Sequence, residues 1–233
     1  MKLAIFDMDG LMFDTGRLAY RVYLEASKQL DFELTPDVYY YLTGRNEVGI
    51  RQGLVDLYGI EAPTNELRDL VHDIRSQVLM VEKRVYKKKG LLEILNFLKE
   101  KDISIALASS SKRETIDKYL EMESMPELFD VIIAGDEVEV GKPNPEIFLK
   151  ACQKLKISPG EAIVFEDSLA GIEAANLGGM TSILIPDDIR DLDSIKGKYK
   201  IKMALPVEKT TTYAPTHVFN NLLEAKEFLS NRK

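Results

Sequence analysis

The sequence predicts an α/β fold in which a doubly wound parallel sheet carries an inserted helical domain. Short apolar runs rich in Ile and Val recur along the chain without polar alternation, which is typical of strands buried on both faces of a parallel sheet. Segments with helical spacing lie between these runs, as strand–helix alternation requires. One long stretch near the N-terminus interrupts the alternation and contains helical patterns only.

Six apolar runs are the expected strands, the last of them weaker than the others. Between them, apolar side chains recur along one face of 91–98 and of 147–155, which indicates helices. This alternation predicts a doubly wound sheet but does not give the order of its strands. The runs are Leu3–Phe6, Ile103–Ala108, Val131–Ala134, Ala162–Phe165, Thr181–Ile185 and His217–Phe219.

The interruption covers residues 15–81, where Leu67, Val71, Ile74 and Val78 exemplify the helical spacing. A long helical insertion directly after the first strand suggests a cap domain. We therefore expect residues 15–81 to form a helical cap, and residues 1–14 and 82–233 to form the α/β core. Residues 187–214 are polar and weakly patterned, and we expect them to be a surface excursion of the core.

Composition excludes several classes of protein. The 233 residues include 31 Lys and Arg against 38 Asp and Glu, and a net charge of −7 argues against nucleic acid as the main partner. The single cysteine, Cys152, excludes an internal disulfide. No apolar run approaches the ~20 residues of a membrane span, and Asp7 interrupts the apolar start too early for a signal peptide. We expect a soluble, cytoplasmic, monomeric protein that binds neither nucleic acid nor a membrane.

Polar residues follow three of the apolar runs at the point where each run ends. Asp7 and Asp9 follow the first run, Ser109 follows the second, and Glu166 and Asp167 follow the fourth. Because ligands of open parallel sheets bind beyond the carboxyl ends of the strands, we expect these side chains to converge. Four carboxylates repel one another unless a cation neutralises them, and oxygen ligands suit Mg²⁺. The predicted cofactor is Mg²⁺, with ligands Asp7, Asp9, Glu166 and Asp167.

Hydroxyl groups and a lysine near these carboxylates indicate a phosphate-binding site. Ser111 and Glu114 fit the capping-box spacing, so a helix with free N–H groups is expected to begin there. Lys142 adds a positive charge on a loop stiffened by prolines. We expect Ser109, Ser110 and Lys142 to bind phosphate. The carboxylate of Asp7 can then act as the nucleophile and Asp9 as the general acid and base.

Together, Asp7-Met8-Asp9-Gly10, Ser109, Lys142-Pro143 and Glu166-Asp167 resemble the four ordered motifs of the haloacid dehalogenase-like hydrolase superfamily. The resemblance is greatest to the group with a helical cap after the first strand, which includes β-phosphoglucomutase-like phosphatases. It implies that Asp7 becomes phosphorylated and binds Mg²⁺, and that Asp9 contributes its backbone carbonyl to the metal. It also implies that Asp167 binds the metal, whereas Glu166 binds it directly or through water.

Departures from the family pattern favour one activity over another. Dehalogenases lack the second aspartate, so Asp9 indicates phosphoryl chemistry. The mutases carry a histidine in the helix after the first motif, but residues 16–20 contain none, which favours hydrolysis. The leading hypothesis is a Mg²⁺-dependent phosphatase acting on a small phosphorylated metabolite, with a sugar phosphate as the best guess. The alternatives are a phosphosugar mutase and a non-catalytic binding or regulatory protein.

Substrate choice in such enzymes is expected to lie in the cap. Residues 43–46, Thr-Gly-Arg-Asn, form a candidate specificity loop. Arg45 in this loop is a weak candidate for contact with an anionic or hydroxylated substrate.

Overall fold

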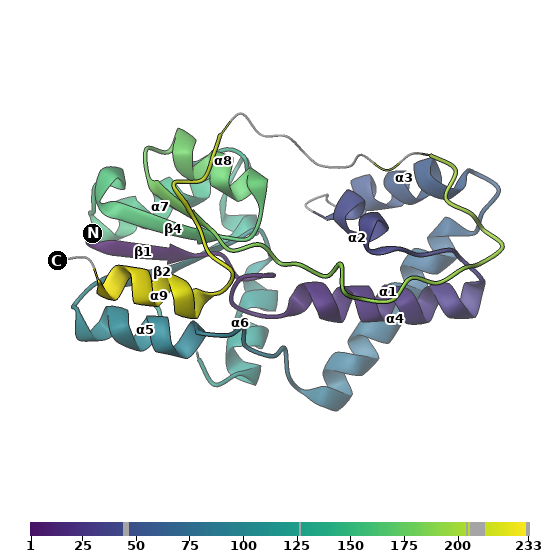
Figure 1. Cartoon of the computed structure of the whole chain (residues 1–233), viewed down its shortest axis with the longest axis horizontal. Coiled ribbons are helices and arrows are strands. Elements are labelled where there is room, and N and C mark those ends of the chain that lie inside the picture. Colours follow the sequence, from purple (N-terminus) through teal and green to yellow (C-terminus); the bar gives the residue numbers. More distant parts are fainter. Residues whose placement is uncertain (44–46, 126, 204, 206–212, 232–233) are drawn as a thin grey trace. The chain divides into compact units, whose positions relative to one another are not determined.

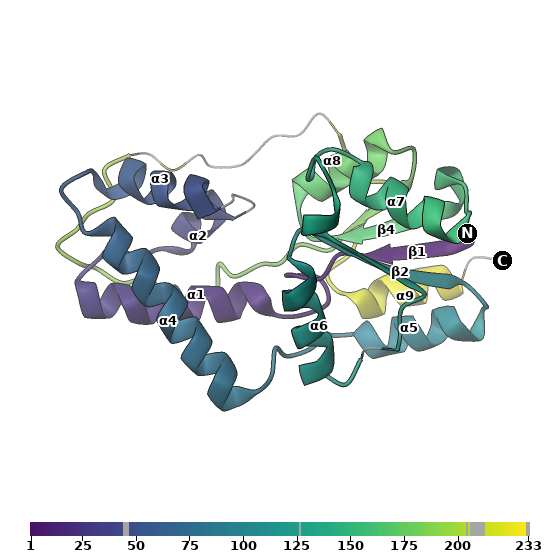
Figure 2. The same ribbon diagram turned by 180° about the vertical axis from the view of Figure 1, so that it is seen from behind.

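A computed structural model describes residues 1–43, 47–125, 127–203, 205 and 213–231 (Figures 1 and 2). The chain divides into two compact units. The sheet unit consists of Met1–Thr15, Arg84–Asp187 and Thr210–Lys233. The helical unit consists of Gly16–Lys83 and Asp188–Lys209.

The sheet unit contains six parallel strands in the order β3-β2-β1-β4-β5-β6. The first strand lies inside the sheet. Later strands are added first on one side of it (β2, β3) and then on the other (β4, β5, β6), which is the doubly wound arrangement. All six predicted apolar runs form strands, and the predicted fold class is therefore confirmed. The strands are β1 (Leu3–Phe6), β2 (Ser104–Ser109), β3 (Val131–Ala134), β4 (Ala162–Glu166), β5 (Thr181–Leu184) and β6 (His217–Val218).

Helices cover both faces of this sheet. Figure 1 shows α7 and α8 over one face and α5 and α9 over the other. Phe148 and Cys152 of α7 pack in the core against Ile5 of β1 and Val164 of β4, so the single cysteine is a buried core residue. The helices are α5 (Leu91–Glu100), α6 (Arg113–Met122), α7 (Glu146–Leu155), α8 (Leu169–Leu177) and α9 (Leu222–Ser230), with short 3₁₀ turns at Gly135–Glu137 and Pro159–Glu161.

The helical unit is built from α1 (Thr15–Leu30), which begins at the last residue of the sheet unit, α2 (Pro36–Leu42), α3 (Glu47–Tyr58) and α4 (Thr64–Glu82). Its core contains Tyr20, Phe32, Tyr58 and Leu67, all almost completely buried. The rings of Phe32 and Tyr58 meet edge to face with centroids 4.9 Å apart, a favourable aromatic geometry. None of the described helices is both long and apolar enough to cross a membrane.

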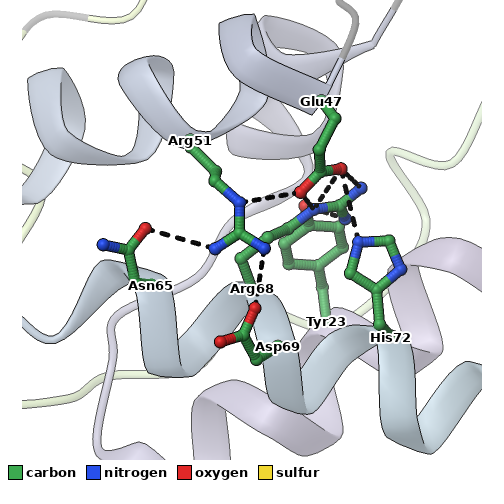
Figure 3. A network of polar contacts seen from close by, with 7 residues as sticks. All are labelled: Tyr23, Glu47, Arg51, Asn65, Arg68, Asp69 and His72. Atoms are coloured by element: carbon green, nitrogen blue, oxygen red, sulfur yellow. Dashed lines mark hydrogen bonds and ion pairs between the residues drawn. The ribbon is translucent and has the colours of Figure 1, made fainter.

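A polar network joins α3, α4 and α1 within the helical unit (Figure 3). The carboxylate of Glu47, at the start of α3, accepts hydrogen bonds from Arg68 Nη2 at 2.7 Å, and its ion pair with Arg51 Nε measures 3.0 Å. His72 Nε2 lies 3.3 Å from the same carboxylate. Arg68 is nearly buried and also donates to the hydroxyl of Tyr23 at 2.9 Å. The Arg68 hydrogen bond lowers the pKa of Glu47, and the network fixes the first turn of α3.

Residues 188–209 differ from the sequence-based expectation. We expected them to belong to the core, but they group with the helical unit. Leu34 and Ile195 exchange backbone hydrogen bonds of 3.0 and 2.9 Å, and Glu33 N donates to Tyr199 O at 2.9 Å. Ile189 is completely buried. Backbone pairing and single anchoring side chains leave no periodic apolar pattern, which explains why the sequence did not show this association. Within the described residues, the chain therefore passes between the two units after residues 15, 83 and 187, where the sequence analysis expected two passages.

Candidate active site

Three strands deliver the predicted site residues to one edge of the sheet. Asp7 follows β1, Ser109 ends β2 and Glu166 ends β4. Phe6 pairs with both Leu107 and Phe165, so Glu166 lies level with Asp7, and Ser109 lies one residue further along. The backbone N–H of Asp7 donates to Phe165 O at 3.0 Å, which continues the sheet pairing to the first residue of the site. The geometry of the parallel sheet thus brings these side chains together.

Lys142 joins two of these carboxylates. Its Nζ donates to Asp7 Oδ1 and to Glu166 Oε1, both at 2.5 Å, and lies 3.3 Å from the carbonyl oxygen of Ala108. The three charged side chains are between 1% and 8% exposed, so water screens their charges little. A single ammonium group is therefore shared by a buried pair of carboxylates and can balance the charge of only one of them.

Glu166 is held at both of its oxygens. While Oε1 accepts from Lys142, Oε2 accepts hydrogen bonds from the backbone N–H and the hydroxyl of Ser168, both at 2.9 Å. The Cβ of an alanine at position 171 would lie 1.9 Å from Glu166 Cδ, so Gly171 leaves the space that the carboxylate occupies. In this arrangement Glu166 orients Lys142, and its predicted contact with a metal stays a prediction.

The pKa values show that negative charge exceeds positive charge at this edge. Burial raises the pKa of Asp7 to about 7, an effect that Lys142 opposes and the charge of Glu166 reinforces. Burial also raises the pKa of Asp167 well above its ordinary value, and the charges of Glu166, Asp7 and Asp187 add to this shift. Burial lowers the pKa of Lys142, but the two carboxylates outweigh it, so its pKa is raised. The lysine stays charged, and the carboxylates favour an additional cation.

Asp9 and the serines after β2 form a second set of contacts. The hydroxyl of Ser111 donates to Asp9 Oδ2 at 2.7 Å, and the Ser111 N–H donates to Ser109 Oγ at 3.1 Å. Ser109 is buried, whereas Ser110 is exposed. The helix predicted to begin at residues 111–114 does begin there, at Arg113, but the predicted capping box is wrong, because the N-cap is Lys112 and it makes no side-chain hydrogen bond. The Ser111 hydroxyl binds the carboxylate instead of the helix.

Gly10 allows the loop after β1 to lie against Asp167. Its φ of +85° is in the region that favours glycine. A Cβ at this position would lie 2.3 Å from Asp167 Oδ2, so a side chain would also displace that carboxylate. The Gly10 N–H donates to Thr15 Oγ1 at 3.1 Å, which closes the loop. This loop and Asp167 thus form one packed unit next to Asp7.

The donor set fits Mg²⁺ in chemistry but is not closed around a metal position. Carboxylate and carbonyl oxygens are the ligands that Mg²⁺ prefers, and the excess of buried negative charge favours a cation. Within the described residues, however, no three His, Cys, Asp or Glu side chains converge as a ready-made metal site. Asp7 is engaged by Lys142 and Asp9 by Ser111.

Asp187 and Lys88, to which the sequence analysis gave no role, lie beside the site. Asp187 follows β5, and its Oδ1 is 2.6 Å from Lys88 Nζ. The signal for Asp187 was present, because it follows an apolar run as Asp7 and Glu166 do. Arg45, the weak candidate for substrate specificity, lies outside the described residues.

Fold and site together define a class of α/β enzymes whose chemistry is carried by carboxylates at the ends of parallel strands. The chain belongs to the haloacid dehalogenase-like hydrolase family, whose model matches residues 4–185. The family resemblance stated from the four motifs is thereby confirmed. The match ends before residue 188, where the chain enters the helical unit for the second time.

Named relatives place the chain in the β-phosphoglucomutase-like group of this family. It is 35% identical over 189 residues to a phosphorylated carbohydrates phosphatase of Thermotoga maritima, with 78% of this chain and 84% of that protein covered. It is 30% identical over 188 residues to the β-phosphoglucomutase of Bacillus subtilis, with 78% and 82% covered. A solved structure of a Thermotoga maritima protein named as a candidate β-phosphoglucomutase superposes over the whole of both chains, with a TM-score of 0.71 and 26% identity.

Proposed function

We propose that this protein is a Mg²⁺-dependent phosphatase that hydrolyses a small phosphorylated carbohydrate through an aspartyl-phosphate on Asp7. The observation that carries this proposal is the buried Lys142 ammonium shared by Asp7 and Glu166 at the strand ends. It places a carboxylate nucleophile beside a fixed positive charge, at the sheet edge where β2 ends with Ser109. The phosphatase among the named relatives supports the class of substrate.

The chain's own residues divide the reaction into two steps. The carboxylate of Asp7 attacks phosphorus and forms the aspartyl-phosphate. As the bond between phosphorus and the alcohol oxygen breaks, Asp9 protonates that oxygen. Asp9, now a carboxylate, takes a proton from a water molecule that attacks the aspartyl-phosphate and releases inorganic phosphate. Lys142 and Ser109 stabilise the charge on the phosphoryl oxygens during both steps.

Asp7, the backbone carbonyl of Asp9 and Asp167 would hold Mg²⁺, with Glu166 contributing directly or through water. When bound, the ion neutralises phosphoryl charge and brings the phosphate dianion close to an anionic nucleophile. The Ser111 hydroxyl donates to Asp9 Oδ2 and so orients the side chain of Asp9.

We assign the helical unit the role of a cap that selects the substrate. Arg45 stays a candidate for this selection, and Arg45→Ala should raise the KM for phosphorylated carbohydrates more than it lowers kcat. The cytoplasmic location and the monomeric state stay predictions of the sequence.

The direct test is phosphate release from a panel of phosphorylated carbohydrates and from p-nitrophenyl phosphate, with Mg²⁺ and with a chelator. Asp7→Asn should abolish turnover, because the amide cannot form the acyl-phosphate bond. Asp102→Asn is the matched control, since Asp102 is exposed and its φ of 54° suits asparagine. Turnover by Asp7→Asn at the wild-type rate would overturn the mechanism.

A phosphosugar mutase is the second candidate, favoured by the identity to the Bacillus subtilis enzyme. It would use the same aspartyl-phosphate but return the phosphoryl group to a second hydroxyl of the sugar. Incubation with β-glucose 1-phosphate and a bisphosphate primer distinguishes the two activities. Free phosphate is expected here, and isomerisation without free phosphate would identify the mutase.

A further inference from the structure

Lys88 lies where three segments of the sheet unit lead to or from the helical unit. Asp14 stands just before the first passage, Lys88 follows the return at residue 84, and Asp187 is the last residue before the third passage. Lys88 Nζ lies 2.6 Å from Asp187 Oδ1 and 3.7 Å from Asp14 Oδ1. The backbone N–H of Lys88 also donates to Met12 O at 2.9 Å, so its position is fixed by the main chain.

Asp187 packs against the same glycine as the candidate metal ligand Asp167. The position that a Cβ would take at Gly10 lies 2.3 Å from Asp167 Oδ2 and 3.2 Å from Asp187 Cβ. The side chain of Asp187 is only 6% exposed, and its negative charge acts on Asp167. The end of β5 therefore adds one more carboxylate to an edge that already has an excess of negative charge.

We propose that Lys88 is a positioning residue that holds the Asp187 carboxylate away from the cation and leaves Asp167 as the ligand from this side. This inference rests on the proposed Mg²⁺-dependent function. Lys88 belongs to none of the four motifs and acts through Asp187, without touching the reacting groups. Its ammonium group lies between two carboxylates, Asp187 and Asp14, which hold it in position.

Loss of Lys88 has a consequence that a merely structural lysine would not have. Without the ammonium group, the buried Asp187 carboxylate loses its ion pair with Lys88 and should move closer to a divalent cation beside Asp167. Carboxylate-rich sites bind Ca²⁺ well, because this ion accepts more oxygen ligands than Mg²⁺ does. Lys88→Ala should therefore unfold at a lower temperature without metal and be stabilised more than the wild type by Mg²⁺ or Ca²⁺. Its kcat should fall several-fold.

Thermal unfolding without metal, with Mg²⁺ and with Ca²⁺ tests this, alongside phosphate release. Asp187→Asn in the Lys88→Ala chain should cancel the extra metal-induced stabilisation, because the two residues act as a pair. Lys89→Ala, at the exposed neighbouring lysine, should behave as the wild type. A Lys88→Ala protein whose metal-induced shift equals that of the wild type would overturn the proposal. So would a shift that survives Asp187→Asn.

Chemical rescue gives an independent test, because Lys88 lines a cavity of about 330 Å³ together with Asn220, Asn221 and Leu222. Ethylammonium should restore the kcat of Lys88→Ala several-fold by placing an N–H donor near Asp187. Tetramethylammonium has no N–H group and should not. Equal rescue by both ions, or none by ethylammonium, would overturn the role of the ammonium group.

The outcomes separate this proposal from the proposed function. If the wild type releases no phosphate and gains no stability from Mg²⁺, the proposed function fails and the role of Lys88 fails with it. If the wild type does both and Lys88→Ala matches it, only the role of Lys88 fails.

Discussion

Two clusters of charged side chains in this molecule balance their charges in opposite ways. At the edge of the sheet, one lysine, Lys142, contacts two buried carboxylates, and Asp167 adds a third nearby. In the helical unit, one carboxylate, Glu47, is surrounded by Arg51, Arg68 and His72 (Figure 3). The first cluster raises carboxylate pKa values, and the second lowers one.

The difference separates a cluster built for chemistry from one built for stability. The negative charge of Glu47 is balanced by its Arg and His partners, so this network stabilises the fold without an added ion. The strand-end cluster keeps negative charge in excess, which costs stability but leaves capacity for a cation and a phosphoryl group. Substitutions at the strand ends should therefore affect activity most, whereas substitutions in the Glu47 network should affect stability and leave activity largely unchanged.

The largest effect is expected from removing the shared cation. Lys142→Met leaves Asp7 and Glu166 facing each other without a countercharge, and breaking a buried ion pair of this kind costs about 3–5 kcal/mol. Phosphate release should fall by about 10³-fold, because a fixed charge on the transferring group is lost. Urea unfolding followed by circular dichroism and a phosphate assay measure both. Lys150→Met, at a lysine whose side chain is 36% exposed, should leave both nearly unchanged.

The next effect concerns the orientation of the cluster and not its charge. Gly171→Ala would place a Cβ 1.9 Å from Glu166 Cδ, so the carboxylate or α8 must move. Overpacking of this kind costs about 1–3 kcal/mol, and displacement of Glu166 should also disturb Lys142 and lower kcat. Gly160→Ala is the matched control, since a Cβ there has no neighbour within 4 Å. Equal kcat and equal stability in the two variants would show that Glu166 does not depend on Gly171.

The sequence predicted those parts of the molecule that follow from periodicity and from the ends of strands. Runs such as Ala162–Phe165 are apolar throughout because both sheet faces are covered, and parallel strands bring Asp7 and Glu166 to one edge. The partners of individual side chains could not be predicted in the same way. The hydroxyl of Ser111 fits a helix cap as well as a carboxylate, and only the fold shows that it binds Asp9.

Backbone pairing is the other source of difference. Ile195 pairs with Leu34 through main-chain hydrogen bonds, and such bonds impose no pattern on side chains. The association of residues 188–209 with the helical unit could therefore not be predicted from the sequence. The strand order was equally hidden, because apolar runs of similar composition could pair in several orders.

A smaller effect should appear in the pH dependence of stability at the strand ends, measured without metal. Burial raises the pKa of Asp7 from 3.8 to about 7, so the folded protein binds the proton more tightly than the unfolded chain does. Stability from this group is complete below its ordinary pKa and is lost as the pH rises towards 7. Asp7→Asn lacks this loss, so its stability relative to the wild type should increase across this range. A difference that does not change with pH would contradict the raised pKa of buried Asp7.

The smallest effect should have the opposite sign and lie in the helical unit. The hydrogen bond from Arg68 lowers the pKa of Glu47, so the folded protein binds that proton less tightly than the unfolded chain. The contribution is present above the ordinary value of 4.5 and is lost as the pH falls through the lowered pKa. The Glu47 side chain is 43% exposed, so water screening limits the effect to about 1 kcal/mol or less. Glu47→Gln should therefore be less stable than the wild type at neutral pH and match it more closely in acid, with unfolding by urea at each pH as the measurement. If Glu47→Gln instead lost stability relative to the wild type on acidification, the two clusters would share one sign, and the contrast between them would not hold.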